Sequence, residues 1–107
     1  MGGFKTRHFI LDENGEVKEE KDFINWSLWF GIADRKIMRT EIDVSEISTV
    51  FVGIGYSFGD IDELLLFETM VFGGKYDGEQ ENYCTREEAV KGHKKWEKII
   101  GEEFNNG

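Results

Sequence analysis

The chain has 107 residues, a formal net charge of −9 at pH 7, no proline and one cysteine, Cys84. This length fits a single domain, residues 1–107, and nine phenylalanines, three tryptophans and three tyrosines supply enough apolar surface for a core. The acidic excess argues against direct binding of DNA or RNA, the single thiol fits a reducing compartment, and neither a signal peptide nor a membrane-spanning run is present, so we expect a cytoplasmic protein.

The first part of the chain predicts a hairpin followed by a helix. Phe4–Leu11 reads as a strand, Asn14-Gly15 is a typical hairpin turn, and residues 17–20 form a short, charged return strand. Asp22 is the expected N-cap of a helix over residues 23–33. The apolar side chains of this helix share one face: Phe23, Trp26, Phe30 and Ala33, with Trp29 beside them.

The second part predicts further strands and a long helix. Residues 36–44 alternate as in a half-exposed strand, while residues 47–54 and 64–72 are apolar on nearly both faces, which is typical of central strands. Tyr83 marks a short last strand. The sequence Thr85-Arg86-Glu87-Glu88 is a capping box, and it begins a helix that ends near Asn105. The apolar positions of this helix are Ala89, His93, Trp96, Ile100 and Phe104.

This order of elements predicts an α+β fold, with a mostly antiparallel sheet of four to five strands and two helices packed on one face. Two helices cannot also cover the second face, although the two central strands are apolar there too. A second copy of the chain, giving a homodimer or higher homo-oligomer, is the preferred cover. A ligand pocket or a layer of loops would also serve.

Glu68 and Arg39 form the first pair of candidate binding residues. A carboxylate between Leu66 and Met70 on a central strand needs a partner or a raised pKa. Arg39, on the neighbouring antiparallel strand, is the expected partner. The pair is either structural or in contact with a ligand.

His93 lies on the apolar face of the last helix, where a histidine is either packed and hydrogen-bonded or available to a ligand as a polar contact or base. Tyr56 and Phe58 lie in one glycine-rich loop, 55–62, and Tyr76 in another, 73–78. These aromatic side chains either bind a base or a partner's pocket, or are tucked inward.

The sequence contains no P-loop, no Gly-x-Ser-x-Gly, no His-Glu-x-x-His and no paired-cysteine motif. The run of glycines at residues 53–59 has the wrong spacing for a dinucleotide loop and precedes a strand. We therefore expect no cofactor and no metal, name no catalytic residue, and prefer binding over catalysis.

Several motifs around the central strands carry a family resemblance. Residues 47–53 read Ile-Ser-Thr-Val-Phe-Val-Gly, residues 57–59 Ser-Phe-Gly, and residues 65–74 Leu-Leu-Phe-Glu-Thr-Met-Val-Phe-Gly-Gly. They are accompanied by Trp26 and Trp29 with Ala33-Asp34-Arg35, Tyr83-Cys84-Thr85, and Glu88-Ala89 with Gly92-His93. From about residue 8 to the last helix, the chain resembles a small uncharacterised protein family common in bacteriophages and prophages.

The resemblance implies a phage accessory protein made in the bacterial host cell, without an established reaction. The family tends to have Asp-His where this chain has Gly55 and Tyr56, and prolines where it has Asp62 and Glu63. If the Asp-His pair performs chemistry in the family, this chain lacks it.

Three functions follow as hypotheses. The first is a binding module used against the host, which sequesters a small nucleotide signal or blocks a host defence protein. The second is a structural, self-assembling phage protein, and the third is a small nucleotide-processing hydrolase that uses Glu68, His93 or Arg39. The first is preferred because it needs no catalytic motif.

Overall fold

The structure is a computed structural model that describes residues 4–58 and 64–106. In these residues the strands form two antiparallel sheets, with the orders β2-β1-β5 and β3-β4-β6-β7. The elements are β1 (Phe4–Leu11), β2 (Val17–Glu19), α1 (Phe23–Ile32), β3 (Lys36–Ile42), β4 (Ser45–Phe51), β5 (Ile54–Phe58), β6 (Phe67–Phe72), β7 (Gln80–Tyr83) and α2 (Arg86–Asn106).

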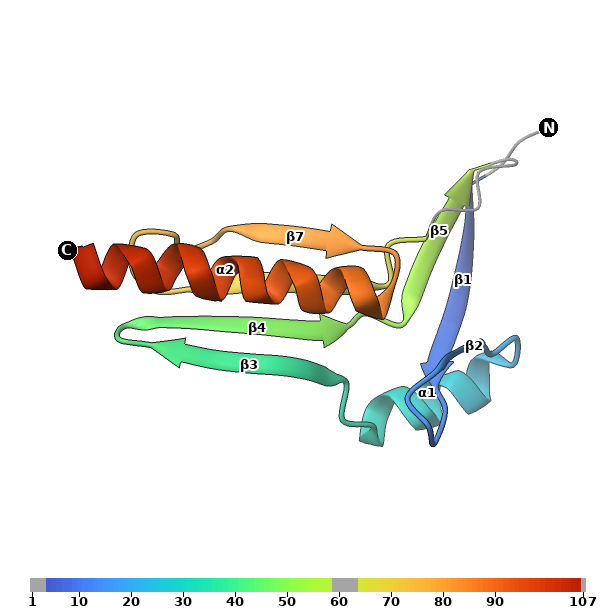
Figure 1. Cartoon of the computed structure of the whole chain (residues 1–107). Helices are drawn as coiled ribbons and strands as arrows, with labels where there is room; N and C mark the ends of the chain where they lie inside the picture. Colours follow the sequence, from blue (N-terminus) through green and yellow to red (C-terminus); the bar gives the residue numbers. More distant parts are fainter. Residues whose placement is uncertain (1–3, 59–63, 107) are drawn as a thin grey trace.

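Each helix packs on its own sheet (Figure 1). α2 lies along the four-stranded sheet and contacts all four of its strands, whereas α1 contacts β1. The α+β class and the antiparallel pairing predicted from the sequence are confirmed. The strands, however, are divided between two sheets, and the helices do not share one sheet face. The result is an elongated molecule with extents of 51 × 32 × 20 Å.

The chain passes from one sheet to the other at Gly53. The sequence predicted a strand up to residue 54 and a loop after it, but β4 ends at Phe51 and residues 54–58 form β5. Gly53 has a φ of +80°, which glycine adopts without a steric penalty. The turn at Gly53 directs the following residues onto β1, with which they pair from His8↔Ile54 to Phe4↔Phe58.

Trp26 joins α1 to this junction. Its indole Nε1 donates hydrogen bonds to the carbonyl oxygens of Phe9 at 3.0 Å and Gly53 at 3.2 Å. The backbone N–H of Phe9 also donates to Gly53 O, at 2.9 Å. The side chain of Trp26 is buried, so its one polar atom is satisfied inside the core.

The face of the four-stranded sheet that α2 covers holds most of the core. Alternate residues of β4 (Ser45, Ile47, Thr49 and Phe51) and of β6 (Phe67, Thr69 and Val71) are buried. From α2, Ala89, Trp96 and Ile100 pack against them. Leu64 and Leu66 were predicted at the start of a strand. They precede β6 and fill the core near the junction instead.

The opposite face of this sheet is not the continuous apolar surface that the sequence predicted. β4 presents Glu46, Ser48 and Val50 there, and β6 presents Glu68, Met70 and Phe72. β3 and β7 add polar residues, including Arg39, Gln80 and Asn82. Because polar and apolar side chains are mixed on this face, it does not require a covering layer.

Both predicted helix starts are present. The Asp22 carboxylate accepts the backbone N–H groups of Ile24 at 2.9 Å and Asn25 at 3.2 Å. At α2, Thr85 Oγ1 accepts the N–H of Glu88 at 3.1 Å and donates to its carboxylate at 3.0 Å. These contacts satisfy amide groups that have no partner within the helix.

Gly92 lets α2 approach β7 closely. A Cβ atom at this position would overlap the hydroxyl group and ring of Tyr83. Glycine costs about 1 kcal/mol relative to alanine inside a helix, so its presence here is explained by the space that Tyr83 needs.

We expect Gly92→Ala to destabilise the protein by about 1–3 kcal/mol, because the added methyl group forces Tyr83 out of its position. Gly101→Ala is the matched control. Gly101 lies on the same helix with nothing within 4 Å of its Cβ position, so this change should stabilise by up to about 1 kcal/mol. Urea unfolding measures both values, and equal effects of the two substitutions would contradict this account of Gly92.

Candidate functional site

The residues that the sequence analysis named do not come together in one site. Arg39 and Glu68 lie on the uncovered face of the sheet, His93 lies beneath α2, and Tyr76 lies in the connection between β6 and β7. Tyr56 and Phe58 belong to β5, and their side chains lie outside the described part of the structure. The remainder of their predicted loop, residues 59–62, is also outside the described residues.

The predicted pairing of Glu68 with Arg39 is wrong. Arg39 Nη2 contacts Glu46 Oε1 at 2.9 Å and Glu41 Oε1 at 2.5 Å. The hydrogen bond from Arg39 lowers the pKa of Glu46. The hydrogen bonds to Glu46 and Glu41 raise the pKa of Arg39. The strand register explains the choice of partner. Arg39 lies opposite Ser48, which is two residues from Glu46 on the same face of β4. The residue of β4 that lies opposite Glu68 is Val50.

Glu68 is hydrogen-bonded by the strand on its other side. Its Oε2 accepts from Gln80 Nε2 at 2.9 Å and from Asn82 Nδ2 at 3.3 Å. The carboxylate therefore has its partners at the edge of the sheet, on β7.

His93 is fully buried beneath α2, and both of its ring nitrogens have a partner. Nδ1 lies 2.7 Å from Thr49 Oγ1, and Nε2 lies 2.9 Å from Thr40 Oγ1. Thr40 Oγ1 also donates to Glu97 Oε2 at 2.5 Å. This is the packed, hydrogen-bonded arrangement, and it leaves the imidazole no surface that a ligand can reach.

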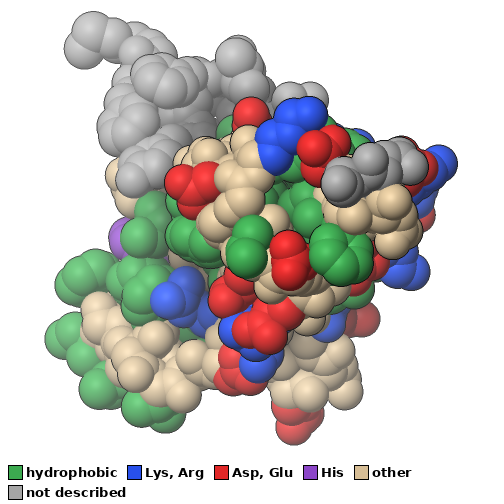
Figure 2. All heavy atoms as spheres, turned by 90° about the vertical axis from the view of Figure 1, so that its left-hand side faces the viewer, with side chains coloured by type: hydrophobic (Ala, Val, Ile, Leu, Met, Phe, Trp, Pro, Cys, Tyr) green, Lys and Arg blue, Asp and Glu red, His purple; other side chains and the backbone are tan. Residues whose placement is uncertain are grey.

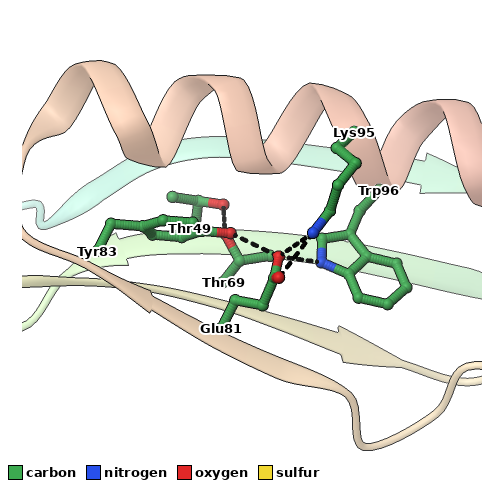
Figure 3. Close-up of polar contacts among 6 residues, drawn as sticks. All are labelled: Thr49, Thr69, Glu81, Tyr83, Lys95 and Trp96. Carbon is green, nitrogen blue, oxygen red and sulfur yellow. Dashed lines mark hydrogen bonds and ion pairs between the residues drawn. The ribbon is translucent and has the colours of Figure 1, made fainter.

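The polar contacts continue across the sheet to β7 (Figure 3). Thr49 Oγ1 and Thr69 Oγ1 lie 2.5 Å apart, and the hydroxyl of Tyr83 donates to Glu81 Oε1 at 3.1 Å. Glu81 also accepts from Lys95 Nζ at 2.6 and 2.7 Å and from Trp96 Nε1 at 2.8 Å. Burial raises the pKa of Glu81, but these donors outweigh it and the net shift is downward.

We call this set of contacts the polar belt: Thr40, Thr49, Thr69, Glu81, Tyr83, His93, Lys95, Trp96 and Glu97. It takes one or more residues from each of the four strands and joins them to α2. In the described residues, no buried side-chain nitrogen or oxygen lacks a hydrogen-bond partner. The belt is therefore a satisfied structural network.

The stability of the protein should fall as the pH falls below about 6.5. Burial lowers the pKa of His93 from its usual value of 6.5, and the charge of Glu97 opposes this only in part. The unfolded chain then binds the proton more readily than the folded chain. The free energy of unfolding therefore decreases as the pH falls from 6.5 to the lower pKa that His93 has in the folded chain. The slope is at most about 1.4 kcal/mol per pH unit.

Urea unfolding between about pH 7.5 and about pH 5 measures this slope, and His8→Gln, which leaves the belt intact, is the control. The ring of His93 followed directly by NMR gives a second measurement that needs no variant. A level free energy of unfolding, or a His93 that titrates at its ordinary value, contradicts the expectation.

A pocket with a mainly apolar lining lies at the end of the four-stranded sheet, where three distant segments meet. We call it the end pocket, and its volume is about 360 Å³. The β3–β4 hairpin contributes Ile42, Asp43, Val44 and Ser45, and the β6–β7 connection contributes Gly74, Lys75 and Tyr76. The end of α2 contributes Ile100, Glu103 and Phe104. Figure 2 looks onto this end of the molecule and shows hydrophobic side chains with acidic groups among them.

Two consecutive glycines allow two segments of the end pocket to pack closely against each other. Gly73 and Gly74 have φ values of +81° and +76°. A Cβ atom on Gly73 would overlap the carbonyl oxygen of Val44, and one on Gly74 would overlap the hydroxyl of Ser45. Ser45 Oγ donates to Gly73 O at 3.1 Å. The Gly-Gly pair therefore lets the β6–β7 connection pack directly on the β3–β4 turn.

The interior of the end pocket is apolar and its rim is charged. Ile100 is buried, while Val44 and Phe104 are 70% and 55% exposed. The ring of Tyr76 packs edge-on against Trp96, with 5.6 Å between centroids. Lys75 Nζ lies 3.4 Å from Glu103 Oε2, and Asp43 stands exposed on the turn with a φ of +51°, unusual for a residue other than glycine.

Sequence reasoning identified Tyr76 but missed Val44 and Phe104. Val44 was predicted in a strand, which in fact ends at Ile42, so Val44 lies in the turn. Phe104 was predicted on the core face of the helix, but it is 55% exposed and lines the end pocket near the end of α2. The Gly-Gly pair was the one signal of a close contact at this point.

Two other depressions in the described residues have more polar linings. One is lined by Leu11, Asp12, Glu13, Gly15, Trp29, Ala33, Asp34, Lys36, Ile37 and Arg86, and the other by Thr6, Arg7, His8, Glu19, Glu20 and Lys21. Neither has the apolar interior of the end pocket, so the end pocket is the stronger candidate site.

Comparison of the chain with protein-family models, with curated proteins and with solved structures finds no match. None of the helices in the described residues has the length and apolar character needed to cross a membrane. Within residues 4–58 and 64–106, no group of three or more His, Cys, Asp or Glu side chains is placed to hold a metal ion.

Proposed function

We propose that this protein is a non-catalytic binding module whose end pocket takes an apolar side chain from a basic segment of another protein. The observation that carries the proposal is the end pocket itself, an open apolar hollow with carboxylates on its rim. The resemblance to a phage family supplies the setting. There, the partner would be a protein of the bacterial host that the phage blocks.

The dimensions of the end pocket suit one side chain with its neighbours. Its volume of about 360 Å³ lies near the lower end of the range for small-ligand sites. Ile42, Tyr76 and Ile100 offer an apolar interior, and the exposed Val44 and Phe104 would lose contact with water when an apolar group enters. Burial of such a group contributes about 25 cal/mol per Å² of apolar area.

The charges around the end pocket favour a cationic partner. Asp43 and Glu103 stand on its rim, and Lys75, the one cation among the described residues that line it, lies beside Glu103. The whole chain carries a formal charge of −9, so the long-range field also attracts basic surfaces. Both the rim carboxylates and the negative net charge of the chain would repel a phosphorylated ligand.

A small nucleotide signal is the second candidate occupant, and the side chains of Tyr76 and Lys75 favour it. A base can stack on an aromatic ring and a phosphate can pair with an ammonium group. Lys75 Nζ lies 5.6 Å from the centroid of the Tyr76 ring, so both contacts are available to one small molecule. Thermal-shift screening with cyclic nucleotides and ADP-ribose tests this candidate.

Defined peptides test the main proposal. The probes are a lysine-rich peptide with one central phenylalanine and the same peptide with glutamate in place of each lysine. In NMR titrations, we expect the basic peptide to shift the resonances of Tyr76, Lys75 and Phe104 and the acidic peptide to leave them unchanged. No shifts with either peptide, or equal shifts with both, would overturn the proposal.

Substitutions at the rim of the end pocket should weaken binding without unfolding the protein. Because Val44 and Phe104 are exposed, Val44→Ser and Phe104→Ser remove binding surface at little cost in stability. We expect each to weaken binding of the basic peptide on the order of tenfold. Leu65→Ser, at an apolar residue that is 53% exposed and does not line the end pocket, is the matched control and should bind like the wild type.

A further inference from the structure

The outer face of α1 is apolar and uncovered. The helix reads Phe-Ile-Asn-Trp-Ser-Leu-Trp-Phe-Gly-Ile and contains no charged residue. Trp26 is buried on its inner side, but Ile24, Leu28 and Ile32 are 70%, 66% and 89% exposed. Phe23, at the start of the helix, is 60% exposed. In Figure 2, hydrophobic side chains gather at the lower left, below the visible histidine and at the height of α1 in Figure 1.

A surface helix normally places polar residues on the side away from the core. α1 does not, because Ile24, Leu28 and Ile32 recur at every fourth position and form one continuous apolar row. Single exposed apolar residues need no explanation, but a row of three on one helix face is typical of an interaction surface.

We infer that this face binds α1 of a second copy of the chain, with the two helices antiparallel about a two-fold axis near Leu28. The face is complementary to itself. The apolar row forms a ridge, and the next row of the helix begins with Phe23 and continues with the small residues Ser27 and Gly31. A Cβ atom on Gly31 would have nothing within 4 Å, so this row is an open groove. A two-fold axis sets the ridge of each helix into the groove of the other.

Charge also favours a second copy at this position. Two chains of formal charge −9 repel one another over most of their surface, but α1 carries no charge to oppose contact. The two ends of the helix are flanked by opposite net charge: Glu20, Lys21 and Asp22 before it sum to −1, and Asp34, Arg35 and Lys36 after it sum to +1. An antiparallel pair therefore sets the acidic start of each helix beside the basic end of the other.

The size of the surface limits the affinity. A helix of ten residues is about 15 Å long, and stable complexes bury about 800 Å² on each partner. One helix pair, even extended by Phe23, covers less than that area. We therefore expect reversible association, with a dissociation constant in the micromolar range.

Sedimentation equilibrium from about 5 to about 500 µM tests the association. We expect the apparent mass to rise from that of one chain towards that of two. Ile32→Lys should weaken association at least about tenfold. Leu65→Lys, which changes an equally apolar exposed residue away from α1, should leave it unchanged. A single-chain mass at every concentration, or equal effects of the two substitutions, would overturn the inference.

Gly31→Leu separates folding from association. The new side chain enters open space and replaces a poor helix former with a good one, so the isolated chain should be at least as stable as the wild type. The same side chain fills the groove, so association should weaken on the order of tenfold. A variant that is more stable and still associates like the wild type would contradict the ridge-and-groove contact.

Cysteine cross-linking tests the orientation, in a Cys84→Ser background whose fold is verified by circular dichroism. An antiparallel pair centred on Leu28 places Ile24 of one chain near Ile32 of the other. A mixture of Ile24→Cys and Ile32→Cys chains should thus oxidise to linked pairs faster than either chain alone. Faster self-linking of Ile24→Cys would mean a parallel pair, and a single-chain protein that binds phosphatidylcholine vesicles would mean a lipid surface; both results overturn the inference.

Discussion

The two ring nitrogens of His93 bind threonines on two different strands, and this arrangement fixes where α2 lies on the sheet. A buried imidazole without partners would cost more than the bonds contribute, so the helix cannot slide along the sheet while His93 stays inside. The rest of the polar belt adds the same restriction at β6 and β7. Because the belt sets the position of α2, it also decides that Ile100 and Phe104 reach the end of the sheet, where they complete the end pocket.

Gly53 and Trp26 set a second constraint, at the junction between the sheets. The positive φ of Gly53 sends β5 away from β4, and the indole of Trp26 binds the carbonyl groups of both strands that meet there. These hydrogen bonds of Trp26 hold the inner side of α1 against the core. The small sheet packs on the inner side of α1, through β1, and the apolar outer row of the helix remains exposed. The two proposed binding surfaces, the end pocket and the outer face of α1, thus follow from the polar belt and from the junction at Gly53.

The features that could be predicted from the sequence are those that local chemistry decides. Asp22 and Thr85 begin their helices by binding amide groups two or three residues away, and residue order alone shows this. The pairing of Glu68 could not be predicted, because it depends on which residues lie opposite one another in β3, β4, β6 and β7. The end pocket was missed for a similar reason, since Val44, Tyr76 and Phe104 are far apart in the chain. Gly53 was placed inside the predicted strand 47–54, because its positive φ, which turns the chain there, cannot be read from the sequence.

The end pocket and α1 lie apart in a molecule about 51 Å long: the pocket is at the far end of the four-stranded sheet, and α1 packs on the other sheet (Figure 1). A pair of chains joined through α1 would carry two end pockets, neither of which is part of the contact between the chains. Such a particle is bivalent: a target that displays the bound segment more than once, as an oligomer or filament does, would be held by both ends at once. The effective concentration of the second site then raises the overall avidity well above that of one pocket, even when each single contact is weak. A chain of 107 residues could in this way retain a large multimeric partner through its end pocket.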